Sequence, residues 1–104
     1  MINQNSTLYN SYLEILINRC FKILPLLEED NQYVSKYVNS LIYELNGLQN
    51  VIEGLENNAW YISLLATLES IYDDCLFDDK SYENIRSEVF KCIDIIKKLK
   101  GVSK

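Results

Sequence analysis

The stretch VSKYVNSLIYELNGLQNVIEGL, residues 34–55, decides the fold. Its large aliphatic side chains recur at alternating spacings of four and three residues: Val34, Val38, Leu41, Leu45, Leu48, Ile52 and Leu55. This spacing puts them on one side of an α-helix, as an unbroken heptad seam. Asn46-Gly47 has the composition of a turn. Because the heptad phase passes through this dipeptide unshifted, the pattern predicts a single helix over residues 31–56.

Helical periodicity continues on both sides of this stretch. Ser6 or Asn5 can cap a first helix over 6–24, which Pro25 stops or kinks near Leu24. Further apolar faces follow over 59–75 and over 81–100, where Ser81 is a suitable N-cap. Short polar connections make neighbouring helices antiparallel. The sequence therefore predicts an all-α fold, an antiparallel bundle of about four helices at approximately 6–24, 31–56, 59–75 and 81–100.

Length and composition indicate one domain over residues 1–104. The chain is 48% hydrophobic, which is enough for a single core. No uncharged run is long enough to span a bilayer, and the first residues lack the basic and apolar regions of a secretory signal. Three cysteines without a Cys-x-x-Cys spacing favour buried free thiols in a reducing compartment. We therefore expect a cytoplasmic protein that contacts no membrane.

Charge is distributed unevenly along the chain. The net charge is −5, with −5 on residues 59–79 and +4 on residues 80–104. An acidic chain is a poor partner for nucleic acid, because phosphate binding needs a concentrated basic face. The lysines near the carboxy terminus complement the dipole of the last helix: Lys97, Lys98, Lys100 and Lys104. We therefore expect no nucleic-acid binding.

The sequence offers little for catalysis. It has no histidine, which excludes Ser-His-Asp and Cys-His catalysis, and its three glycines are too scattered for a phosphate-binding loop. Carboxylates could still hold magnesium between Glu-x-x-Glu pairs. Glu53 and Glu56 have this spacing, but Glu69 lacks a carboxylate three residues on, so we expect the first pair to be solvated. The prediction is a protein that is not an enzyme, with no catalytic residue, metal or cofactor.

The densest charge cluster lies at the exit of the helix predicted over 59–75: Asp73, Asp74, Asp78 and Asp79. Carboxylates at a helix C-terminus oppose the macrodipole and repel one another. One interpretation is a solvated loop in which Asp78 or Asp79 helps cap the next helix. The other is an acidic patch that binds a basic protein surface.

A second candidate surface lies on the helix predicted over 31–56. With Val38, Leu45 and Ile52 at heptad position a, Tyr43 falls at position f and should be exposed. The c positions are Tyr33, Ser40, Gly47 and Gly54. Glycine inside a helix costs roughly 1 kcal/mol relative to alanine, so two of them one heptad apart suggest close approach by a partner. Neutral sequence drift on a solvent-exposed face explains the two glycines equally well.

These features favour a small acidic protein-binding module, such as an inhibitor that blocks a basic partner protein. In size, acidity and helical class, the chain resembles the small acidic immunity proteins that neutralise cationic nuclease toxins. Trp60-Tyr61 is the nearest match to the paired tyrosines of that family, and no proline follows it here. The alternatives are a structural module that self-associates into a homo-oligomer and a carboxylate-metal nucleotide hydrolase.

Overall fold

The computed structural model describes residues 3–4, 6–29, 32–77 and 81–101. Its elements are α1 (Thr7–Phe21), α2 (Ile23–Glu28), α3 (Val34–Leu48), the 3₁₀ turn η1 (Leu55–Asn57), α4 (Ala59–Cys75) and α5 (Tyr82–Gly101). No strand occurs in this part of the chain. The predicted all-α class and antiparallel bundle are confirmed.

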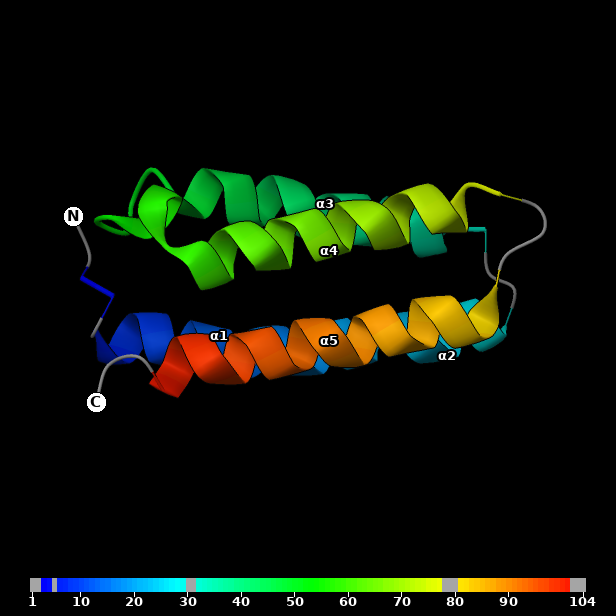
Figure 1. The fold of residues 1–104 in the computed structure, drawn as a ribbon, viewed down its shortest axis with the longest axis horizontal. Coiled ribbons are helices and arrows are strands. Elements are labelled where there is room, and N and C mark those ends of the chain that lie inside the picture. Colours follow the sequence, from blue (N-terminus) through cyan, green and yellow to red (C-terminus); the bar gives the residue numbers. More distant parts are fainter. Residues whose placement is uncertain (1–2, 5, 30–31, 78–80, 102–104) are drawn as a thin grey trace.

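The helices run along the long axis of an elongated bundle (Figure 1). In this view α3 and α4 form one layer, and α1, α2 and α5 form the other. The extents are 41 × 22 × 20 Å. The end of α4, the start of α5 and α2 all lie at the same end of the bundle (Figure 1).

Polar side chains define the starts of three helices. The Ser6 hydroxyl accepts hydrogen bonds from the backbone N–H groups of Leu8 and Tyr9 at 3.1 and 3.5 Å. Asn58 Oδ1 accepts from Trp60 N–H and Tyr61 N–H at 2.9 and 3.2 Å. Ser81 Oγ accepts from Asn84 N–H at 3.3 Å. Each cap satisfies amides that have no partner within the helix, and the predicted caps at Ser6 and Ser81 are confirmed.

The break near Pro25 differs from the prediction. Helix α1 ends at Phe21, and the chain resumes a helix at Ile23 that continues through Pro25 to Glu28. Proline lacks an N–H group, and its ring clashes with the carbonyl four residues earlier, which here belongs to Phe21. The break therefore falls before the proline, which takes a tolerated place in the first turn of α2.

The predicted continuous helix over 31–56 is wrong at its carboxy-terminal end. Helix α3 ends at Leu48, and Gly54 adopts a left-handed φ of 76° before η1. The last four carbonyls of a helix lack intrahelical partners. One of them, Leu45 C=O, accepts a hydrogen bond from the Tyr61 hydroxyl of α4 at 2.5 Å. A side chain outside the helix therefore satisfies one terminal carbonyl, and backbone amides of the following turn satisfy those of Gly47 and Leu48.

The heptad phase nevertheless predicted burial correctly beyond this end. Ile52 and Leu55 lie outside α3, yet they are 1% and 0% exposed. They belong to a core drawn from every helix, whose members include Leu13, Leu16, Ile23, Val38, Leu41, Leu45, Tyr61, Leu64, Leu68, Ile71, Ile85, Val89 and Ile96. The chain after α3 is therefore not α-helical at these positions, but the side chains of Ile52 and Leu55 still point into the core.

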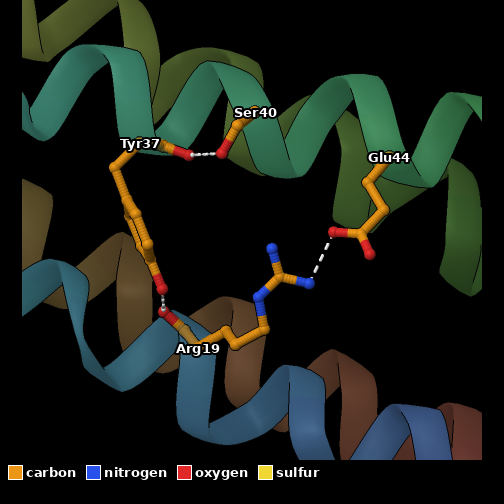
Figure 2. A network of polar contacts seen from close by, with 4 residues as sticks. All are labelled: Arg19, Tyr37, Ser40 and Glu44. Atoms are coloured by element: carbon orange, nitrogen blue, oxygen red, sulfur yellow. Dashed lines mark hydrogen bonds and ion pairs between the residues drawn. The ribbon is translucent and has the colours of Figure 1, made fainter.

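Long polar side chains bridge α1 and α3. No Cα atom of α1 lies within 8 Å of one of α3, although other neighbouring helices approach that closely. Figure 2 shows how the boundary is bridged. The Tyr37 hydroxyl donates to Arg19 C=O at 2.8 Å, and Arg19 Nη1 lies 2.5 Å from Glu44 Oε2. Ser40 Oγ donates to Tyr37 C=O at 2.6 Å.

The two glycines of residues 34–55 should respond oppositely to alanine. Gly47 is helical and exposed, and a Cβ there would meet no atom within 4 Å, so Gly47→Ala should raise the free energy of unfolding by about 0.5–1 kcal/mol. At Gly54 the positive φ and the Gln4 amide, 3.2 Å from an added Cβ, should make alanine destabilising by about 1 kcal/mol or more. Urea unfolding of both variants measures these changes. Stabilisation at Gly54 would contradict the described turn and restore the continuous helix.

The cysteines provide a second prediction, because all three are buried, as the sequence predicted. Burial raises the pKa of Cys20 to about 12 and also raises that of Cys92. Both should resist a thiol reagent at pH 8 in the folded protein and react after denaturation. Cys75, the last residue of α4, should react sooner because a helix end opens locally. Mass spectrometry of time points identifies each labelled site, and rapid native labelling of Cys92 would contradict the position of α5.

Candidate functional site

The acidic cluster predicted from the sequence is described only in part. Asp73 and Asp74 occupy the last turn of α4, with Asp73 exposed and Asp74 half-buried. Asp78 and Asp79 lie outside the described residues. Helix α4 contains three carboxylates and no lysine or arginine. Nothing within the helix therefore offsets the repulsion between its carboxylates.

Packing of α5 against α4 adds another carboxylate, which sequence reasoning missed. Glu88 of α5 lies close enough to Asp74 and Ser70 of α4 for both to affect its pKa. Partial burial raises the pKa of Glu88, and Asp74 raises it further, while Ser70 and Lys91 act in the opposite direction. Neither Asp74 nor Glu88 forms an ion pair with a described lysine or arginine. The two carboxylates therefore lie near each other, on two neighbouring helices.

Two large apolar side chains follow these carboxylates in the chain. Leu76 is 57% exposed and Phe77 is 65% exposed. Leu76 caps the end of α4 through its backbone, while its side chain remains largely accessible to solvent. We call Asp73, Asp74, Leu76, Phe77 and Glu88 the acidic end of the bundle. The sequence signal for its apolar part was Leu76-Phe77 itself, an apolar pair inside a polar connection.

A hollow lies between α2 and the first turns of α5. It has a volume of about 180 Å³ and is lined by residues of α2 and of the first turns of α5: Leu24, Leu27, Glu28, Tyr82, Glu83 and Arg86. The sequence offered no signal for it, because the lining residues come together only through the packing of α2 on α5.

The predicted surface on α3 is only partly retained. Tyr43 is 73% exposed, which confirms its predicted position. Tyr33 is 66% exposed, and the Lys36 ammonium lies 5.5 Å from the centre of its ring. Gly47 stays on the helix, but Gly54 lies in the turn beyond it, so the predicted row of four c positions ends at Gly47. Tyr33, Tyr43 and Gly47 remain predicted partner contacts. A positive φ favours glycine, so the backbone conformation alone explains why residue 54 is a glycine.

Residues considered for other functions have different surroundings. Glu53 and Glu56 are exposed, and they lie on either side of the left-handed Gly54 rather than on one helical face. No group of three or more metal-binding side chains occurs among the described residues. Lys98 lies 4.5 Å from the centre of the Trp60 ring, and Lys100 pairs with Glu14. No described helix has the length and hydropathy that a membrane span requires.

The repulsion within the acidic end provides a third prediction. The pKa of Glu88 is raised in the folded state, so the folded protein binds this proton more tightly than the unfolded chain does. The protein therefore loses stability as the pH rises through the folded-state pKa. At pH 7 Glu88→Gln should therefore raise the free energy of unfolding by about 0.3 kcal/mol. At pH 4, where the native carboxyl is largely protonated, the gain should shrink. Urea unfolding at both pH values tests this, and a less stable variant at pH 7 would show that Glu88 is favourably paired.

Comparisons of the chain with protein-family models, with curated proteins and with solved structures found no match.

Proposed function

We propose that this protein is a protein-binding module whose acidic end docks on a basic surface of a partner protein and covers it. The observation that carries this proposal is the nearness of two carboxylates, Asp74 of α4 and Glu88 of α5, neither of which forms an ion pair with a described lysine or arginine. Such a pair costs free energy in the unbound protein. A lysine or arginine supplied by a partner would relieve that cost.

The exposed apolar residues support the same function. Binding surfaces combine a few large anchors with a charged rim that directs the approach of the partner. Phe77 and Leu76 have the size and exposure of anchors, and Asp73, Asp74 and Glu88 provide the charge. Occupying the functional surface of a partner in this way would make the module an inhibitor.

Affinity capture with matched baits tests the proposal. The native chain is compared with Asp74→Asn/Glu88→Gln and with Glu53→Gln/Glu56→Gln, which removes the same number of charges from an exposed site outside the acidic end. A partner should be captured by the native and control baits, elute with salt, and be lost from the Asp74/Glu88 variant. Equal capture by that variant would refute docking through the acidic end.

A further inference from the structure

The hollow between α2 and α5 combines an apolar lining with a charged rim. Leu27, 2% exposed, and the half-buried Leu24 belong to α2, while the Tyr82 ring comes from the first turn of α5. Glu28 and Glu83 contribute carboxylates, both on exposed residues. An apolar group entering the hollow would therefore pass between acidic side chains.

One cation shares this rim. Arg86 also lines the hollow, and its guanidinium carbon lies 5.7 Å from the centre of the Phe90 ring. The Phe90 ring in turn makes an edge contact with Phe21 of α1, at 5.9 Å between ring centres. Two carboxylates and one guanidinium leave the rim with a net negative charge. The last turn of α4, which contains Asp73 and Asp74, lies at the same end of the bundle as α2 and the start of α5 (Figure 1).

The size of the hollow limits what can occupy it. Pockets for drug-sized molecules usually have volumes of about 300–1,000 Å³. A cavity of about 150 Å³ in another protein admits benzene. The present hollow, at about 180 Å³, therefore matches one large apolar side chain.

From this geometry we infer that the hollow receives one apolar side chain of a basic segment of the partner, with lysine or arginine next to that side chain in the partner's sequence. The inference rests on the proposed function and specifies how the partner is recognised. The apolar side chain contacts Leu24, Leu27 and Tyr82. The flanking cations approach Glu28 and Glu83.

A peptide titration of the full chain tests this inference. The probe is acetyl-Lys-Arg-Phe-Arg-Lys-amide, added to ¹⁵N-labelled protein at low salt and followed by NMR. We expect saturable shifts of the amides of Leu24, Leu27, Tyr82, Glu83 and Arg86. A peptide with serine in place of phenylalanine, and one with glutamine in place of each cation, should each bind at least about fivefold more weakly.

Two variants locate the peptide. Leu24→Trp fills the hollow and should reduce the affinity of the phenylalanine peptide to that of the serine peptide. Ile15→Trp places the same side chain at an exposed position of α1 outside the hollow and should leave the affinity unchanged. Should Leu24→Trp fail to fold, Glu28→Gln/Glu83→Gln retains the apolar lining and should weaken binding of the cationic peptide.

The outcomes separate this inference from the proposed function. Equal affinity for the phenylalanine and serine peptides, with shifts centred on Asp74 and Glu88, would overturn the role of the hollow and leave docking through the acidic end intact. The absence of saturable binding by either peptide would also overturn the inference, while partner capture by the native chain would still support the proposed function. The inference is supported if Leu24→Trp loses the preference for the phenylalanine peptide over the serine peptide and Ile15→Trp retains it.

Discussion

Replacing Tyr61 with alanine should lower the free energy of unfolding by about 3–5 kcal/mol. The ring is 0% exposed and packs in the core between α4 and the rest of the bundle. Its hydroxyl also satisfies Leu45 C=O in the last turn of α3, at 2.5 Å. Alanine would therefore leave a cavity and also leave a buried carbonyl without its donor. Equilibrium urea unfolding measures the loss.

Tyr61→Phe isolates the hydroxyl, because it retains the ring. We expect it to cost about 1–3 kcal/mol, the usual penalty for a buried polar group left unpaired. Hydrogen exchange should also accelerate at the carboxy-terminal turn of α3 more than in α5. If Tyr61→Phe were as stable as the native protein, the hydroxyl would not determine where α3 ends.

Replacing Asp73, Asp74, Asp78 and Asp79 with asparagine should lower the association rate with a captured partner by at least about tenfold at low salt. Charge complementarity acts mainly on the approach of two proteins, so the native rate should fall as salt rises and converge on that of the variant. The fold should be retained, because asparagine has nearly the same size and shape as aspartate. Surface plasmon resonance at two salt concentrations measures both rates.

Phe77→Ala provides a contrast with these charge changes. An exposed aromatic that becomes buried in an interface acts as an anchor, and its loss is felt mainly in dissociation. We therefore expect faster dissociation with little change in the salt dependence of association. If the fourfold asparagine variant associated as fast as the native protein at both salt concentrations, the aspartates at the end of α4 would not belong to the interface.

Heptad spacing was sufficient to predict the helical bundle and much of its core. The period predicted that Val38, Leu41, Leu45, Ile52 and Leu55 are buried, and all of them are. It could not predict where α3 ends, because burial and helical conformation are separate properties. A carbonyl at the helix end, Leu45 C=O, is satisfied by Tyr61, sixteen residues away in the chain. Asn46-Gly47 gave the local signal for a nearby turn, and the continuing period concealed it.

The candidate site was less predictable than the fold. Asp73 and Asp74 stand out in the sequence as a charge cluster, but Glu88 joins Asp74 only through the packing of α5 against α4. The hollow likewise requires α2 to lie on the first turns of α5. The start of α2 follows from Pro25. In a continuous helix the Pro25 ring would clash with the carbonyl of Phe21, so the helix breaks four residues before the proline. Local sequence patterns do not predict these contacts between helices.

Hydrogen–deuterium exchange of the captured complex tests docking through the acidic end most directly. We expect the partner to slow exchange in peptides covering the end of α4, Asp73–Phe77, and the first turns of α5, through Glu88. Exchange over Val34–Leu48 in α3 should remain as in the free protein. Slowed exchange confined to α3, with the end of α4 and the start of α5 unchanged, would contradict the account and assign the interface to the face of Tyr33 and Tyr43.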